Sequence, residues 1–315
     1  GRLLIGIGAG FTWVGALTLV TLFFPARRFA LLVGLAQLIG MLGAVFGQAP
    51  MAAAVHAYGW RATLVAATLG GVVLALAMWI VVRDKPRAAR GASMPTGMLQ
   101  GLRRVGANPQ TWYCALLGGA MTAPVLSFAG LWGVPYLVSV YGVPRPDAAL
   151  VASLGFLGFG IGAVIHGYWS DRMGRRKPPL VLGSATLLVS LLTMFLGGLP
   201  DLRWFGAFSF LQGLGAGCMV VAFAAAREHN PVNATGAAYG LVNTFVVASG
   251  ALFQPLIGWL LDQRWSGTML DGARVYSPDT YTFALSSLLV MSVIGLAMAM
   301  LVRETHCQQQ ISPGS

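Results

Sequence analysis

The stretch Gly167-Tyr168-Trp169-Ser170-Asp171-Arg172-Met173-Gly174-Arg175-Arg176-Lys177 joins two long apolar segments, residues 148–169 and 178–199. A helix needs about 20 mostly apolar residues to cross the hydrocarbon core of a bilayer, and each segment is long enough. Glycines permit a tight turn between antiparallel helices, and the Asp171 carboxylate can accept hydrogen bonds from the N-terminus of a neighbouring helix. The stretch therefore predicts a short polar connection between two membrane-spanning helices.

Apolar segments of this kind recur along the whole chain. The run Leu180–Leu196 does not alternate between apolar and polar residues, as the strands of a transmembrane barrel would. Asn108-Pro109 is a helix start, because Asn suits the N-cap and Pro the first helical position. We therefore predict an all-α polytopic membrane protein. Its nine transmembrane helices are expected at residues 3–24, 29–55, 61–82, 111–140, 148–169, 178–199, 204–226, 235–261 and 280–302.

The composition excludes two classes of protein. Hydrophobic residues make up 57% of the chain and charged residues only 9%, whereas ordinary globular domains carry about 25% charged residues. A soluble enzyme and a disordered chain are both excluded. Cys114, Cys218 and Cys307 are too few and too scattered for a disulfide framework or a zinc site. We expect neither a metal nor a cofactor.

Charge is distributed unevenly between the two sides of the membrane. With nine helices, the connections on one side hold 14 of the 20 Lys and Arg residues, and those on the other side hold 6. The positive-inside rule makes the first side cytoplasmic, so we expect a bacterial-type inner membrane protein with its linker and C-terminus in the cytoplasm. The net charge of +11 reflects a scarcity of acidic residues, which number 9, and no nucleic-acid partner is expected.

An internal repeat relates the first three segments to the last three. Gly6–Gly10 matches Gly213–Gly217 at an offset of 207 residues, and Gly43–Phe46 matches Gly250–Phe253 at the same offset. Matches in the same direction indicate parallel repeats. Because segments four to six have no N-terminal counterpart, we expect three further helices upstream. The whole protein would then have twelve helices in two halves of six, of which nine are present.

This repeat predicts the domain boundaries. The linker contains Met98, Leu99, Leu102 and Val105 at helical spacing, next to basic residues, which is consistent with a short interfacial helix or with a flexible connection. On the other side of the membrane, residues 268–276 contain Asp-Gly and predict a small hairpin. The expected parts are residues 1–83 (last three helices of the N-terminal half), 84–108 (cytoplasmic linker), 109–303 (C-terminal half) and 304–315 (cytoplasmic tail).

The stretch 167–177 resembles the cytoplasmic loop signature of the major facilitator superfamily, G-x-x-x-D-R-x-G-R-R/K, in its second-half position. The resemblance implies the major facilitator fold and a charged latch that stabilises one state of an alternating-access cycle. The residues that it assigns to the latch are Gly167, Asp171, Arg172, Gly174 and Arg175, with Glu228 as their partner at the cytoplasmic end of the seventh segment. Arg176 and Lys177 are interpreted as ordinary positive-inside charge.

Two further family patterns are matched incompletely. Arg2-Leu3-Leu4-Ile5-Gly6-Ile7-Gly8 resembles R-x-x-Q-G-x-G, associated with the fourth helix of many proton-coupled members, but Ile5 replaces the glutamine. A buried Arg2 needs a partner, so either that partner lies in the missing helices or Arg2 itself lies near the outer surface. Gly34–Pro50 does not reproduce the signature of drug antiporters, and that function loses support.

Amide side chains are the best candidates for a substrate site between the halves. Gln37 and Gln48 are 11 residues apart, as are Asn243 and Gln254, so each pair lies on one helix face. Such amides could hydrogen-bond a neutral or zwitterionic solute, or they could join helices to each other. The remaining candidates are Trp13, Trp132, Gln212 and Arg2.

Three functions are weighed. The leading one is a secondary active transporter, expected to be a monomer, that moves a small organic solute across the inner membrane by alternating access, with protons or another ion as the coupling partner. A membrane-embedded enzyme is disfavoured because the nine segments contain no mid-membrane acid, nucleotide loop or metal-ligand cluster. A non-transporting receptor or sensor of the same fold is the alternative.

Overall fold

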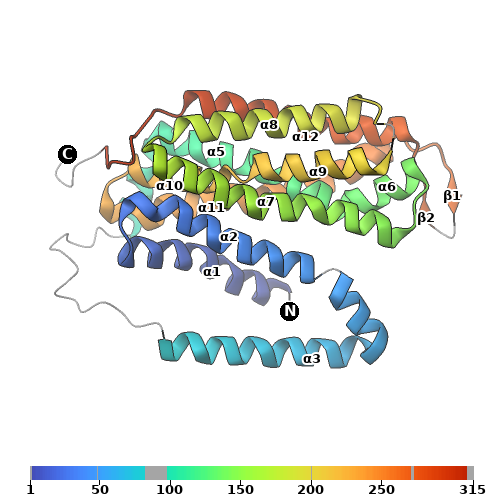
Figure 1. The fold of residues 1–315 in the computed structure, drawn as a ribbon, viewed down its shortest axis with the longest axis horizontal. Coiled ribbons are helices and arrows are strands. Elements are labelled where there is room, and N and C mark those ends of the chain that lie inside the picture. The colour runs from blue at the N-terminus through green and yellow to red at the C-terminus, as the bar shows by residue number, and fades with distance from the viewer. Residues whose placement is uncertain (1, 48, 82–97, 200, 271–272, 311–315) are drawn as a thin grey trace.

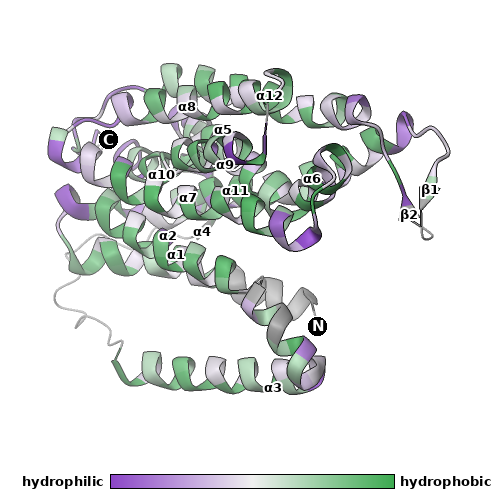
Figure 2. Ribbon diagram, turned by 45° about the vertical axis from the view of Figure 1, so that its right-hand side comes forward, coloured by the Kyte–Doolittle hydropathy of each residue, from purple (hydrophilic) through white to green (hydrophobic). Residues whose placement is uncertain are grey.

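The computed structural model describes residues 2–47, 49–81, 98–199, 201–270 and 273–310. Long helices lie side by side along the longest axis of the molecule (Figure 1). Hydrophilic residues gather at the two ends of the bundle, and the middle is predominantly hydrophobic (Figure 2). Eight helices among the described residues are long and apolar enough to cross a membrane, and α1 adds a further apolar helix. The predicted all-α membrane fold is confirmed.

The N-terminal helices are α1 (Arg2–Phe23), the 3-10 turn η1 (Ala26–Arg28), α2 (Phe29–Phe46) and α3 (Ala49–Val81). The expectation of one continuous helix over 29–55 is wrong. Helix α2 ends at Phe46, and a new helix starts at Ala49. Gly59 interrupts α3 with a φ of 79°, a value that favours glycine, so the chain turns into its next span there.

The linker contains a helix. Of the two alternatives that the sequence left open, the structure has the helix, α4 (Met98–Ala107). Val105 is buried against Ala234 and Ala238, whereas the side chain of Leu99 is exposed. One face of α4 therefore packs on the bundle. Residues 84–97 of the predicted linker lie outside the described residues.

The C-terminal part contains six spans. Four of them are single helices, one consists of two consecutive helices, and one is formed by three consecutive segments of which the middle one is a π-helix. The elements are α5 (Pro109–Pro124), η3 (π-helix, Val125–Trp132), α6 (Gly133–Tyr141), α7 (Arg145–Met173), α8 (Lys177–Leu196), α9 (Leu202–Ala216), α10 (Met219–Glu228), η4 (Val232–Ala234), α11 (Thr235–Gln263) and α12 (Pro278–Leu301).

Local signals fixed several of these elements. The Asn108 side chain accepts a hydrogen bond from the Gln110 amide at 3.0 Å, with Pro109 at the first helical position, and this predicted helix start is confirmed. The predicted hairpin is also present, with β1 (Met269–Leu270) antiparallel to β2 (Ala273–Arg274). Its Asp-Gly turn lies outside the described residues.

Two irregularities in the spans were not predicted. The π-helix η3 lies between Pro124 and Pro135, and each proline removes one regular helical hydrogen bond. The seventh predicted segment is two helices, α9 and α10, separated at Gly217 and Cys218. Both interruptions lie within membrane spans.

Glycines bring α2 and α7 into backbone contact. Gly34 faces the Ala163 backbone, and Gly167 faces the backbone of Ala30. A side chain at either glycine would overlap the opposite helix, and small residues allow membrane helices to approach this closely. This contact joins the N-terminal helices to the C-terminal bundle next to the site described below (Figure 1).

Candidate functional site

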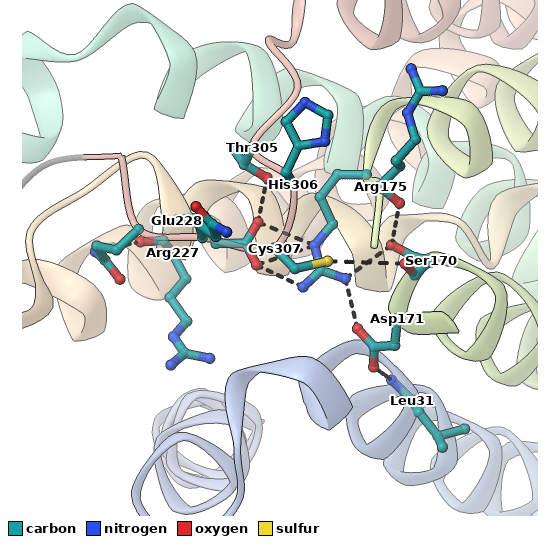
Figure 3. A network of polar contacts seen from close by, with 12 residues as sticks. Leu31, Ser170, Asp171, Arg175, Arg227, Glu228, Thr305, His306 and Cys307 are labelled. Atoms are coloured by element: carbon teal, nitrogen blue, oxygen red, sulfur yellow. Dashed lines mark hydrogen bonds and ion pairs between the residues drawn. The ribbon is translucent and has the colours of Figure 1, made fainter. Parts of the chain in front are cut away.

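A buried arginine is the centre of a charged network at one end of the bundle (Figure 3). The Arg176 side chain is fully buried. Its Nη2 lies 2.6 Å from Glu228 Oε1, and its Nη1 lies 2.7 Å from Asp171 Oδ1. Its Nε also donates to both Glu228 carboxylate oxygens at 3.1 Å. We call Asp171, Arg176 and Glu228 the latch triad.

Three helix ends and one turn position the triad. Asp171 lies in the last turn of α7, Arg176 precedes α8, and Glu228 is the last residue of α10. Gly174 ends α7 in the left-handed conformation, with a φ of 66°, as glycine does at many helix C-termini. The turn returns the chain so that Arg176 points back between α7 and α10.

Asp171 also connects the triad to the N-terminal helices. Its second oxygen, Oδ2, accepts a hydrogen bond of 2.9 Å from the Leu31 amide, in the first turn of α2. Free N–H groups and a positive partial charge at a helix N-terminus favour a carboxylate there. The hydrogen bond from a helix N-terminus that the sequence predicted for Asp171 is confirmed.

Burial makes each partner in the triad necessary. Desolvation alone would lower the pKa of Arg176, but the hydrogen bonds and the charge of Glu228 raise it above its ordinary value. The guanidinium is therefore charged. Removing one partner of a buried ion pair leaves an uncompensated charge and costs about 3–5 kcal/mol.

The sequence assignment of the arginines was wrong in one respect. Arg176, interpreted as ordinary surface charge, occupies the centre of the network. Arg172 instead lies at the surface and donates to the Tyr168 hydroxyl at 2.7 Å. Arg175 is also exposed, and its Nε is 3.7 Å from Glu304. Which of these arginines turns inward depends on the bend at Gly174, and the order of the residues alone does not specify it.

The last described residues of the chain lie against the triad and hydrogen-bond to it. We call residues 302–310 the C-terminal strap. The Glu304 carboxylate accepts hydrogen bonds from the backbone amides of Arg176 at 2.7 Å and Lys177 at 3.0 Å. Thr305 Oγ1 donates to the Glu228 carboxylate, and the Gln310 amide donates to the Glu228 carbonyl at 2.8 Å. The strap therefore fixes Glu228 and the start of α8 together.

From the sequence, residues 304–310 of this strap were placed in the cytoplasmic tail and given no role. Burial raises the pKa of Glu304, but hydrogen bonds from the amides of Arg176, Lys177 and two strap residues outweigh it, and the net pKa is below the ordinary value. One feature of the sequence could have indicated the strap: Glu304 is an acidic residue directly after the last span. In the structure it lies close to the free backbone amides at the N-terminus of α8. Next to it, burial lowers the pKa of His229, whose Nε2 is 3.2 Å from the Arg303 carbonyl oxygen.

Other contacts join the two groups of helices at the same end. Thr21 Oγ1 and the Tyr239 hydroxyl are 2.9 Å apart. The ring of Tyr239 stacks on Phe29, with centroids 5.7 Å apart. The candidate residue Trp13 contacts Phe223 edge to face at 6.0 Å. These contacts connect α1 and α2 to α10 and α11.

The candidate substrate residues are placed in different ways. Gln37 is buried in α2, and Asn243 is half-buried in α11. Gln254 Nε2 donates to the Leu126 carbonyl, and Trp132 Nε1 donates to the Gln254 carbonyl, both at 3.0 Å. These two side chains therefore join helices, which is the alternative left open above. Gln48 and the side chain of Arg2 lie outside the described part of the chain.

Gln212 is the exception among these candidates. Its side chain is fully buried in α9, and within the described residues neither of its amide atoms has a hydrogen-bond partner. Ser209, one turn earlier, is also fully buried with an unpartnered hydroxyl. Both side chains face Gly155 of α7, within 3.4 Å of where a Cβ would lie. Polar groups buried in this way normally have a partner.

The fold and the network define a polytopic helical membrane protein whose two groups of helices are joined by a buried charge network at one end. Comparison with known proteins identifies the family. The sequence model described as Major Facilitator Superfamily matches residues 1–145 and 125–313. The chain belongs to the major facilitator superfamily.

Individual relatives include a sensor and a transporter. "Membrane sensor protein UhpC" of Salmonella typhimurium is 27% identical over 286 residues, covering 84% of this chain and 62% of the relative. "Niacin transporter NiaP" of Acinetobacter baylyi is 33% identical over 110 residues, covering 35% of this chain and 24% of the relative. The chain thus spans less than two thirds of the length of either curated relative.

A solved structure supports the fold. A bacterial homolog to the human lysosomal transporter Spinster, in an inward-facing and unoccupied conformation, superimposes with a TM-score of 0.54. The two proteins are 19% identical, and the alignment covers 86% of this chain and 68% of that chain. At this identity the similarity concerns the fold alone.

Proposed function

We propose that the protein is a secondary active transporter that moves a small organic solute across the inner membrane by alternating access. The observation that carries this proposal is the hydrogen bond between Asp171 and the Leu31 amide, because it connects the N-terminal helices to the C-terminal bundle at one end. Alternating access requires the two groups of helices to separate there and to close at the other end. The latch triad would stabilise the state that is closed at its own end.

The triad is divided unequally between the two groups of helices, and this division suits a reversible latch. Arg176 and Glu228 both belong to the C-terminal bundle, and the strap holds them together. Within the triad, only the Asp171 contact crosses to α2. Besides the contacts of Thr21 and Phe29 with Tyr239, opening therefore breaks one hydrogen bond to a charged group, worth about 1.5–3 kcal/mol, and leaves the buried Arg176–Glu228 pair intact. That energy is in the range over which a ligand can shift a two-state equilibrium.

The proposed orientation and site complete this function. The latch end faces the cytoplasm, in agreement with the positive charge on that side. Gln37 and Asn243 bind the solute between the halves, with an ion gradient of protons or another ion as the driving force. Because a transporter named for niacin aligns with a third of the chain, niacin is the first solute to test.

A membrane sensor is the second candidate function. It is favoured by the alignment with a protein named as a membrane sensor, which covers 84% of the chain. A sensor needs the same switch between states and no net flux. Flux therefore separates the two functions, whereas ligand binding alone does not.

Reconstitution into proteoliposomes tests the transport proposal. We expect accumulation of labelled niacin or a related small solute when a proton or sodium gradient is imposed, and loss of accumulation when the gradient is collapsed. Gln37→Ala and Asn243→Ala should lower the rate without loss of folded protein. Ligand-induced protection of the protein without flux under any gradient would instead support the sensor.

A further inference from the structure

An apolar groove lies between α7 and α9, at the end of the molecule opposite the latch triad. Its volume is about 590 Å³. Leu150 and Leu154 of α7 form one wall, and Gly206, Phe210 and Leu211 of α9 form the other. The two helices lie side by side on the face shown in Figure 1. Apolar side chains of this groove are exposed, including Leu150 at 67%, which is expected of a surface in contact with lipid.

A single cation is placed at the mouth of the groove. Arg203, in the first turn of α9, is the only charged residue among those lining it. In the part of the chain that the structure describes, Arg203 forms no ion pair. The neighbouring Asp201 carboxylate accepts hydrogen bonds from the backbone amides of Arg203 and Trp204. The carboxylate thus caps the helix, and the guanidinium remains available.

The groove has one charged end and apolar walls, which is the arrangement that an amphiphile such as a lipid has. Trp204 is exposed beside Arg203, and tryptophan is enriched at the level of the lipid headgroups. From Arg203 to Leu211 the helix advances about 12 Å, at about 1.5 Å per residue, while the hydrocarbon core is about 30 Å thick. The charged end therefore lies at the interface, and the apolar walls extend into the hydrocarbon.

We propose that this groove binds one anionic phospholipid from the leaflet facing away from the latch. Its phosphate pairs with Arg203, and one acyl chain lies between Leu154 and Phe210. Arginine binds phosphate through paired N–H donors in a planar fork, and the interface is the level at which lipid phosphates lie. This proposal does not depend on transport, because it concerns the outer surface of the C-terminal bundle.

Native mass spectrometry of the purified full chain tests the proposal with phosphatidylglycerol and phosphatidylcholine of equal chain length. One positive charge near a membrane surface corresponds to about a fivefold preference for an anionic lipid. We expect the unmodified chain to retain phosphatidylglycerol with this preference. Arg203→Gln should remove the preference, and Ala207→Phe, at an exposed position lining the groove, should displace both lipids.

Arg145→Gln is the matched control, because Arg145 is exposed at the start of α7 on the same side and does not line the groove. It should retain the preference for phosphatidylglycerol. Equal retention of the two lipids by the unmodified chain would overturn the proposal. So would an equal loss of preference in Arg145→Gln, or full retention in Ala207→Phe.

Discussion

The latch triad and the middle of α9 are both buried polar regions, and they differ in how completely their polar atoms are partnered. Around Arg176, two carboxylates and the Ser170 hydroxyl accept its hydrogen bonds. Around Gln212, the described residues provide no partner for either amide atom. Because an unpartnered buried polar group costs free energy, this state is stabilised at the latch and penalised at Gln212. The comparison locates where a change of state would lose interactions and where it could gain them.

The largest effect is expected from removing the centre of the triad. Arg176→Ala leaves two buried carboxylates without their cation, so the free energy of unfolding should fall by about 3–5 kcal/mol. Arg172→Ala is the matched control at the exposed position of the same turn, and it should change stability by less than about 0.5 kcal/mol. Thermal unfolding in detergent measures both. Equal losses would show that burial of Arg176 is not what stabilises this end.

Removing the unpartnered amide should have the opposite sign. Gln212→Leu eliminates two unsatisfied atoms and should stabilise this state by about 1–3 kcal/mol. Gln254→Leu removes a hydrogen bond to the Leu126 carbonyl and should destabilise it by about 1 kcal/mol. The same unfolding assay compares the two variants. A destabilised Gln212→Leu protein would indicate that the amide is partnered in the membrane.

A smaller effect is expected at the contact that crosses between the helix groups. Asp171→Asn keeps an acceptor for the Leu31 amide but removes the charge facing Arg176, so the latch should weaken by about 1–2 kcal/mol. Cysteine labelling at the latch end should then become severalfold faster. Asp147→Asn, an exposed substitution in the first turn of α7, should leave labelling unchanged. Unchanged labelling in Asp171→Asn would show that the triad does not control opening at the latch end.

The smallest effect concerns pH and the C-terminal strap. The pKa of Glu304 is lower in the folded protein than its ordinary value of 4.5. The ionised carboxylate therefore stabilises the docked strap above about pH 4.5, and this stabilisation is lost as the pH falls through the lower folded pKa. The hydrogen-exchange protection of residues 302–310, which is the slowing of exchange relative to the intrinsic rate at the same pH, should fall in acid. Glu304→Gln should show low protection already at neutral pH, and strap protection that does not change with pH would contradict this assignment.

Local signals in the sequence were sufficient for most of the fold. Hydropathy identified the spans, and Asn108-Pro109 marked a helix start, because both depend on residues next to each other. The inward turn of Arg176 could not be predicted, since it depends on the left-handed bend at Gly174 and on the ends of three helices that meet around the side chain. Predicting the strap would have required knowing that residue 304 lies next to the start of α8 in the folded protein. Pairing of Gln37 with Asn243 across the halves stays a prediction.

The glycine contact between α2 and α7 has a consequence for how the molecule moves. At Gly34 and Gly167 one backbone rests directly on the other, so these positions have no side-chain rotamers that must repack when the helices tilt. In the proposed alternating-access cycle such a surface would act as a pivot, and the free-energy cost of changing state would fall on the contacts at either end of it. A methyl group at Gly34 would overlap the Ala163 backbone and fix the angle between the two groups of helices.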